Sequence, residues 1–291
     1  MALTWRNSRH TMDIPALQYE PLVRAALAED IGPGDITSIL CIPAGTRATA
    51  VMLAKQPGVI AGLAIAEMAF HLIDPEAVWE AHLSDGARVG EGRTPLATIT
   101  GDARALLTAE RVALNFVQRL SGIATLTAKY AALTVGTHAR IADTRKTTPG
   151  LRMLEKYAVR AGGGFNHRLG LYDAVLIKDN HIKAAGSIAQ AVAAARARIS
   201  HTMKIEVEAA TLKMVEEALQ VKADIILLDN MDTETMRSAV QMIAGRAISE
   251  ASGGLTEARI AEVAATGVDI LSIGALTHSA PALDISLDFK D

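Results

Sequence analysis

The second half of the chain repeats one pattern, in which a short apolar run is followed by a longer amphipathic segment. Past residue 138, each run ends at a polar residue or a glycine. Runs of this length are typical of buried strands, and their alternation with segments of helix length indicates a parallel sheet with helical crossovers. The runs cover residues 140–142, 174–177, 205–207, 225–228, 247–251 and 270–273. They predict six strands of an α/β barrel, TIM-like and either complete or incomplete.

Four of the amphipathic segments predict crossover helices. They cover residues 187–198, 211–221, 233–244 and 256–265, with Ala, Leu, Val and Met at helical spacing. Each begins with Ser or Thr, whose hydroxyl oxygen can accept a hydrogen bond from a free backbone N–H of the first turn. We therefore expect Ser187, Thr211, Thr233 and Thr256 to cap these helices.

The first 115 or so residues differ, because their segments are shorter and alternate apolar and polar positions. Residues 47–53 and 94–100 are the clearest, and turns such as Asp85-Gly86 separate these segments. Alternation of this kind is typical of half-buried strands, so we predict a smaller α+β domain. A helix over about 105–135, interrupted near Gly122, would link it to the barrel. The predicted domains are residues 1–115, the barrel at 116–275, and a tail at 276–291 that returns to the N-terminal domain.

The composition excludes several classes of protein. Half of the 291 residues are hydrophobic, which is ample for a buried core. The near balance of 29 basic and 32 acidic residues, with 3% aromatic side chains, argues against a nucleic-acid surface. Cys41 is the only cysteine, which excludes a disulfide or a thiolate metal site within one chain and fits a reducing cytoplasm. We expect no signal peptide in residues 1–19 and no membrane span, so the partners should be small molecules or copies of the chain.

Cations gather in one stretch of a chain whose formal net charge is only −3. Like charges about 4 Å apart repel by roughly 4 kcal/mol at an effective dielectric near 20, so a fold that brings cations together must place anions among them. Internal carboxylates would make this stretch a solvated helix face with ordinary ion pairs, whereas a ligand would make it a pocket for a small polyanion. The cations are Arg145, Lys146, Arg152, Lys156, Arg160, His167 and Arg168, and the nearby carboxylates are Asp143, Glu155, Asp173 and Asp179.

Polar residues follow the predicted strands, at the positions where an α/β barrel carries its active site. The functional side chains of such barrels gather at the carboxyl ends of the strands, where the loops to the helices begin. At any single position a polar residue is explained by contact with solvent, but the whole set predicts one site. The set comprises Arg145, Lys146, Lys178, Glu208, Asp229, Ser252 and Gly274.

Several motifs, in this order along the chain, resemble the quinolinate phosphoribosyltransferase family, also called the carboxylating nicotinate-nucleotide pyrophosphorylases. The most specific are Asp143-Thr-Arg-Lys-Thr-Thr-Pro-Gly-Leu-Arg152, Asn166-His-Arg168 and Lys178-Asp-Asn-His181. The resemblance runs nearly end to end, and departs mildly at Val112 and Leu255. Less specific matches are Ala28-Glu-Asp-Ile-Gly-Pro-Gly-Asp-Ile-Thr-Ser38, Leu228-Asp-Asn230, Ser252-Gly-Gly254 and Ser272-Ile-Gly-Ala-Leu-Thr-His278.

The resemblance implies an N-terminal α+β open sandwich domain, an α/β barrel and a reaction in NAD biosynthesis. Quinolinate would take the phosphoribosyl group of 5-phosphoribosyl 1-diphosphate, with loss of pyrophosphate and carbon dioxide, to give nicotinate mononucleotide. Guanidinium groups bind carboxylates through paired hydrogen bonds, so Arg111, Arg145 and Arg168, with His167, suit the two carboxylates of quinolinate.

The remaining site residues would serve the sugar and the phosphates. The resemblance places Lys146 and Lys178 between the dicarboxylate and the phosphates, and Glu208 and Asp229 near the sugar carbon that becomes cationic. Mg²⁺ is the expected cofactor, held mainly by the substrate diphosphate, with Glu208 and Asp229 as candidate protein ligands. Backbone N–H groups at Ser252, Gly253 and Gly274 could hold the 5′-phosphate. The expected catalytic residues are therefore Lys146, Lys178, Glu208 and Asp229.

The resemblance further implies a homodimer in which Arg111 enters the partner's site, and the sequence does not decide whether dimers pair into a hexamer. Gly162-Gly-Gly164 could be a phosphate cradle, but a flexible connection that delivers His167 and Arg168 is simpler. His181 is better explained as a structural residue. Three other functions stay open: a barrel lyase with Lys178 as Schiff-base amine, a non-catalytic anion-binding protein, and a phosphoribosyltransferase for nicotinate.

Overall fold

The computed structural model describes residues 14–290, and their contacts divide the chain into two compact units. The first unit comprises the residues up to 128 together with 148–163 and those from 279 onward. The second unit comprises residues 129–147 and 164–278. The domain boundaries expected at residues 115 and 275 stay a prediction. The expected absence of a signal peptide rests largely on residues 1–13, which lie outside the described residues.

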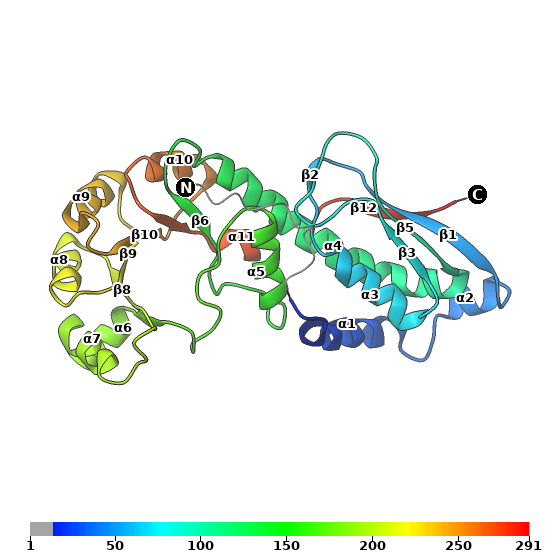
Figure 1. The fold of residues 1–291 in the computed structure, drawn as a ribbon, viewed down its shortest axis with the longest axis horizontal. Helices are drawn as coiled ribbons and strands as arrows, with labels where there is room; N and C mark the ends of the chain where they lie inside the picture. The colour runs from blue at the N-terminus through cyan, green and yellow to red at the C-terminus, as the bar shows by residue number, and fades with distance from the viewer. Residues whose placement is uncertain (1–13, 291) are drawn as a thin grey trace, which may run out of the picture. The chain divides into compact units, whose positions relative to one another are not determined.

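An antiparallel sheet with the strand order β12-β1-β5-β3 is the centre of the first unit (Figure 1). The predicted strands are confirmed as β1 (Arg47–Ala54) and β5 (Thr94–Asp102), which pair with each other. β12 (Ile285–Phe289) pairs with the other edge of β1, so the end of the chain returns to this sheet. The other elements of the unit are β3 (Val78–Ala81), β2 (Gly58–Val59), β4 (Arg88–Val89), α1 (Ala16–Ile31), α2 (Ile36–Cys41), α3 (Leu63–Ile73) and α5 (Arg152–Ala161).

The long helix α4 (Ala103–Ala132) is continuous, and the predicted interruption near Gly122 is wrong. Gly122 is needed for another reason, because a Cβ atom there would lie 1.9 Å from the backbone oxygen of Pro281. The segment before β12 therefore crosses α4 in direct contact with its backbone, and Leu283 N donates to Gln118 O at 2.9 Å. Neither α4 nor any other helix within residues 14–290 is both long and apolar enough to cross a membrane.

Gly122→Ala should destabilise the protein by about 3 kcal/mol, because the new methyl group cannot fit against Pro281 without moving the C-terminal segment. In an exposed helix the same change would stabilise by about 1 kcal/mol, so the sign of the effect tests the contact. Urea unfolding measures it. The control is Gly90→Ala, where the added Cβ meets nothing within 4 Å. Equal stability of the two variants would show that α4 is not covered at Gly122.

The six predicted strands are confirmed in the second unit as one parallel sheet, in the order β6-β11-β10-β9-β8-β7. The barrel is incomplete, because the edge strands β6 and β7 do not pair with each other in the described residues. Phe165 instead forms a parallel bridge with Ala142 at the open edge of β6. The strands are β6 (Arg140–Ala142), β7 (Val175–Ile177), β8 (Ile205–Ala209), β9 (Ile225–Asp229), β10 (Ile248–Ser252) and β11 (Ile270–Ser272).

The crossover helices lie along the outside of this sheet, as predicted (Figure 1). They are α6 (Asp179–Ala185), α7 (Ile188–Arg196), α8 (Leu212–Gln220), α9 (Thr233–Ile243) and α10 (Glu257–Ala264), followed by the short α11 (Ala275–His278). Ser187 and Thr211 cap α7 and α8 through their side chains, as expected. The expected cap at Thr233 is wrong, because Asp232 accepts from Thr235 N one position earlier. Thr256 occupies the cap position of α10 but makes no side-chain cap hydrogen bond.

Candidate active site

The carboxyl ends of the parallel strands surround a cavity of about 650 Å³. Lys178 follows β7, Glu208 lies near the end of β8, Asp229 and Ser252 end β9 and β10, and Gly274 follows β11 closely. Parallel strands bring these positions to one edge of the sheet, although they are distant in the sequence. Ten of the predicted site residues line the cavity, namely Arg145, Lys146, His167, Arg168, Lys178, Glu208, Asp229, Ser252, Gly253 and Gly274.

A deeper layer of the cavity comes from residues two positions earlier on the strands. Side chains at positions i and i−2 of a strand point to the same face. Residues directly below the strand ends therefore face the same interior, and four of them line the cavity: Leu176, Leu227, Glu250 and Ser272. The interior thus contains an acid, Glu250, that the sequence analysis did not select.

Two half-buried arginines, Arg145 and Arg168, supply positive charge to the cavity. Arg168 Nη1 donates to Ala174 O at 3.2 Å, but the Nε atoms of Arg145 and Arg168 are buried without a hydrogen-bond partner among the described residues. Burial lowers the pKa of Arg168 below its usual value, and the positive charge of Arg145 lowers it further. Buried donors are normally satisfied, so unsatisfied donors on two neighbouring guanidinium groups fit an anionic ligand.

The cavity also carries negative charge, from the carboxylates of Glu208 and Asp229, and Lys178 lies beside the first of these. Lys178 Nζ lies 2.9 Å from Glu208 Oε2, and the Glu208 side chain is only 13% exposed. Asp229 Oδ2 accepts a hydrogen bond from Asn230 Nδ2 at 2.9 Å. Glu208 and Asp229 therefore offer carboxylate oxygens beside a cationic group, which suits both a sugar cation and a divalent metal ion.

Two glycines keep the loops of the cavity close to their neighbours. Gly253 has a φ of +85°, and a Cβ atom there would lie 2.3 Å from Asn230 Oδ1. At Gly274 a Cβ atom would lie 2.7 Å from Lys146 Cδ, and Thr277 Oγ1 donates to Lys146 O at 2.7 Å. Both glycines line the cavity, and neither carries a side chain of its own there.

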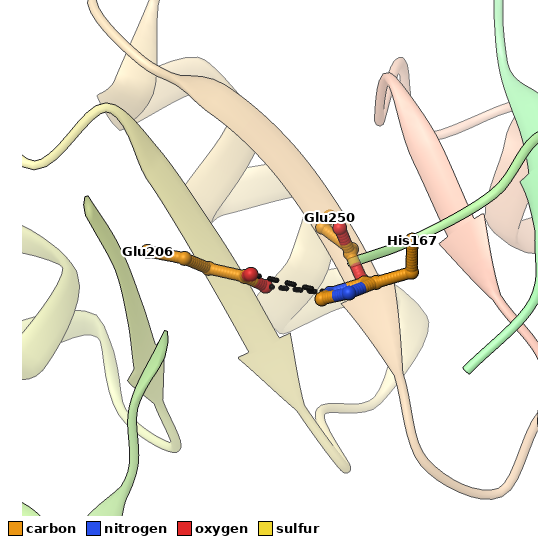
Figure 2. Close-up of side chains that lie close together, drawn as sticks. All are labelled: His167, Glu206 and Glu250. Carbon is orange, nitrogen blue, oxygen red and sulfur yellow. Dashed lines mark hydrogen bonds and ion pairs between the residues drawn. The ribbon is translucent and has the colours of Figure 1, made fainter. Parts of the chain in front are cut away.

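His167 lies between two buried glutamates, as Figure 2 shows. Its Nε2 atom is 3.2 Å from Glu206 Oε2 and 3.4 Å from Glu250 Oε1, and the three side chains come from different elements. Its Nδ1 atom accepts from Arg168 N at 2.7 Å, so the ring proton is on Nε2. Burial and the charge of Glu206 raise the pKa of Glu250 to about 7, against the opposing effects of His167 and a hydrogen bond from Ser272.

Asp143 anchors the segment that carries His167 and Arg168. It is fully buried at the end of β6, and it accepts from His167 N at 2.9 Å and from Asn166 Nδ2 at 2.5 Å. A sequence signal existed for Asp143, Glu206 and Glu250, since each is an acid within or directly after a short apolar run. Such an acid must be compensated when it is buried, and that requirement distinguishes it from an acid exposed to solvent.

The structure separates the basic residues of the sequence into two groups. Arg145, Lys146, His167 and Arg168 line the cavity, whereas Arg152, Lys156 and Arg160 belong to α5 in the first unit. There the carboxylate of Glu155 is paired with Arg119 at 2.8 Å, but the Glu155 side chain is fully buried, so this helix is not the solvated face of the alternative interpretation. Arg111 is exposed on α4, also in the first unit, and does not line the cavity.

Two further motif residues have local structural roles. Gly162-Gly-Gly164 does not line the cavity, and a Cβ atom at Gly162 would lie 2.3 Å from Ala124 O, so close packing on α4 explains that glycine. His181 Nδ1 accepts from Lys178 N at 2.9 Å at the start of α6. The contact of His181 agrees with the structural role expected for it, whereas close packing, rather than the expected flexible connection, explains Gly162.

The fold and the cavity define an α/β-barrel enzyme that binds a polyanionic substrate. Comparison with known families makes this specific: the quinolinate phosphoribosyl transferase N-terminal domain matches residues 35–121, and the C-terminal domain of the same enzyme matches residues 123–288. The chain belongs to the quinolinate phosphoribosyltransferase family.

Individual relatives support this assignment over the whole chain. The probable nicotinate-nucleotide pyrophosphorylase [carboxylating] of Bacillus subtilis is 46% identical over 272 residues, which is 94% of this chain and 93% of that protein. The nicotinate-nucleotide pyrophosphorylase [carboxylating] of Mycobacterium leprae is 47% identical over 91% of this chain and 95% of its own. The crystal structure of NadC from Streptococcus pyogenes, 42% identical, superposes with a TM-score of 0.92 over 97% of this chain and 100% of that one.

Proposed function

We propose that the cavity transfers the phosphoribosyl group of 5-phosphoribosyl 1-diphosphate to quinolinate, with loss of carbon dioxide. The products are nicotinate mononucleotide, pyrophosphate and carbon dioxide, and the reaction belongs to NAD biosynthesis. The observation that carries this proposal is the convergence of cations and carboxylates on one cavity, at the strand ends of a chain that belongs to this family. The carboxylates and phosphates of the two substrates require cations, and the sugar carbon that becomes cationic requires carboxylates.

Quinolinate binds at the end of the cavity that contains Arg145 and Arg168. Their unpartnered Nε donors and planar guanidinium groups match a pair of adjacent carboxylates. His167 has protein partners at both ring nitrogens, so it meets the substrate through its ring edge and supports the backbone of Arg168. Arg111 of a second protomer completes this end of the site in a homodimer.

Catalysis is electrostatic rather than covalent. As pyrophosphate departs, the sugar carbon C1 gains positive charge, which the carboxylates of Glu208 and Asp229 stabilise. Lys146 and Lys178 hold the departing diphosphate by charge, while backbone N–H groups at Ser252, Gly253 and Gly274 hold the 5′-phosphate. Glu208 and Asp229 also fit Mg²⁺, which takes one or two carboxylates besides substrate phosphates and would lower the negative charge of the leaving group.

Two other functions are less consistent with the site. A Schiff base needs a free amine, and Lys178 Nζ is instead ion-paired with Glu208 Oε2 at 2.9 Å. A transferase for nicotinate needs cations for one carboxylate, whereas the cavity has two arginines in addition to its lysines.

Cys41 is exposed and free, which supports a reducing cytoplasm as the location.

An activity assay tests the proposal. Purified protein is supplied with 5-phosphoribosyl 1-diphosphate, Mg²⁺ and either quinolinate or nicotinate, and the nucleotide and carbon dioxide are measured together. We expect equal amounts of nucleotide and carbon dioxide from quinolinate, and little nucleotide from nicotinate. Nucleotide formation from nicotinate at a similar or higher rate, without carbon dioxide, would assign the site to the other acid.

Mixing two inactive variants should restore activity if Arg111 acts in the partner's site. In a heterodimer of Arg111→Ala and Lys146→Ala chains, one site receives an intact Lys146 and an intact Arg111, and the other site lacks both. Random pairing makes half of the dimers mixed, each with one intact site of two, so roughly a quarter of wild-type activity should return. The assay follows a mixture refolded together, with separately refolded variants as controls. Purified heterodimers without activity would show that the site takes no arginine from its partner.

A further inference from the structure

Glu250 is an acid of the cavity for which phosphoribosyl transfer has no use. It lies on β10 two residues before Ser252, so its side chain faces the same interior, and it lines the cavity although the residue is only 2% exposed. Its Oε1 atom makes no hydrogen bond with the described residues. His167 Nε2 lies 3.4 Å away but makes no hydrogen bond to it. A buried acid oxygen without a hydrogen bond is unusual and needs an explanation, and substrate chemistry is one.

The surroundings of Glu250 favour its protonated form. Glu206 on β8 and Asp143 directly after β6 are buried acids whose charges raise the pKa of Glu250, and Arg145 and Arg168 are cations that line the same cavity. His167 opposes this effect, because its charge lowers the pKa of Glu250. The pKa of about 7 that follows from burial and from the charge of Glu206 leaves Glu250 able to give a proton at neutral pH.

The same geometry argues against a metal ion between the three side chains. One histidine and two carboxylates within 4.8 Å of one another could in principle bind a metal ion. Metal binding at Nε2 would move the ring proton to Nδ1, where it would face the N–H of Arg168 at 2.7 Å. Two donors cannot share that contact, so the cluster holds a proton rather than a metal ion.

The reaction proposed for this site has one step that needs a proton. After transfer, loss of carbon dioxide breaks the bond between C2 of the pyridinium ring and its carboxylate, and the electron pair stays on C2. That carbon must gain a proton to give nicotinate mononucleotide. Glu250 lines the cavity, and an acid with a pKa near the working pH is suited to the transfer.

We propose that Glu250 is the catalytic acid that protonates C2 as carbon dioxide leaves, and that Glu206 and His167 are positioning residues for it. The bond between C2 and its carboxylate and the O–H bond of Glu250 break in the same step in which the C2–H bond forms, so the release of carbon dioxide depends on the proton. The carboxylate of Glu250 regains its proton from water after the product departs. The inference rests on the proposed function, because the step exists only if quinolinate is the substrate.

Glu250→Gln should separate the two products in the first turnover. Quinolinate labelled in its C2 carboxylate is mixed with excess protein, 5-phosphoribosyl 1-diphosphate and Mg²⁺, and pyrophosphate and labelled carbon dioxide are followed in time. The wild type should release both together. The variant should release pyrophosphate within a few-fold of the wild-type rate but carbon dioxide roughly 100-fold more slowly, with phosphoribosyl quinolinate accumulating. The control is Glu216→Gln on α8, an exposed glutamate outside the cavity, which should behave as the wild type.

The pH dependence of the wild type gives a second measurement that does not need the variant to fold. The rate of carbon dioxide release should fall as the pH rises through about 7, because Glu250 then loses its proton. The rate of pyrophosphate release should not fall over the same pH range. The inference is overturned if Glu250→Gln releases both products together, at any rate, or if the two pH profiles of the wild type coincide. A wild type that releases neither product refutes the proposed function and the inference with it.

Discussion

Glu208→Ala should lower kcat by roughly 100- to 1,000-fold while quinolinate still binds, because the variant loses a carboxylate that acts only when the sugar becomes cationic. The Glu208 side chain is 13% exposed, so little water is available to replace its charge. Its loss also leaves Lys178 without the carboxylate that lies 2.9 Å away, which should disturb the leaving diphosphate. The proposed quinolinate site uses other side chains, so the Kd for quinolinate should change far less than kcat.

The matched variant Glu208→Gln separates charge from shape. Glutamine keeps the size of the side chain and an oxygen that can accept from Lys178, but it carries no negative charge. If charge stabilisation is the role of Glu208, Glu208→Gln should lose nearly as much kcat as Glu208→Ala. Steady-state kinetics and calorimetric titration with quinolinate measure both quantities. Full activity of Glu208→Ala and of Asp229→Ala would contradict the assigned roles and favour a protein that binds anions without catalysis.

Gly253→Ala should raise KM for 5-phosphoribosyl 1-diphosphate and lower kcat, each by roughly tenfold or more, because the added methyl group cannot coexist with Asn230. Its Cβ would lie 2.3 Å from Asn230 Oδ1, and the φ of +85° is unfavourable for alanine by about 1–2 kcal/mol. Asn230 holds Asp229 through a hydrogen bond of 2.9 Å. Displacing Asn230 therefore disturbs the proposed phosphate loop and a proposed catalytic carboxylate together.

Gly245→Ala is the control for backbone strain. Gly245 has a similar φ of +72°, but a Cβ atom there meets nothing within 4 Å. It should lose a similar amount of conformational stability without a change in KM or kcat. Unfolding curves and steady-state kinetics of both variants distinguish strain from collision. If Gly253→Ala retained the wild-type kinetics, the loop would not be held against Asn230 as the structure has it.

The sequence predicted the positions of the strands because each strand of the second unit is a short apolar run with a polar end. Lys178, Glu208, Asp229 and Ser252 could be selected for the same reason, since the end of a parallel strand has a known place in the fold. Which strands are neighbours could not be read from the pattern. The pairing of β6 with β11, distant in sequence, is a property of the folded sheet.

The basic residues show most clearly what could not be predicted from the sequence. Arg145 and Arg152 are seven positions apart in one motif, yet Arg145 lines the cavity and Arg152 begins a helix of the first unit. Charge and spacing cannot predict which of the two arginines lines the cavity, because the chain passes from one unit to the other between Arg145 and Arg152. Glu206 and Glu250 were missed for the opposite reason, since acids inside apolar strands were treated as part of the strand. The roles of Arg111 and Mg²⁺ stay predictions.

The account depends on where quinolinate binds, and a crystal structure of the protein with quinolinate tests it most directly. We predict that the two carboxylates lie against Arg145 and Arg168 inside the cavity, with the ring nitrogen directed toward Glu208 and Asp229 and C2 within reach of Glu250. Quinolinate bound outside this cavity, or with its carboxylates turned toward Glu208 and Asp229, would contradict the proposed site.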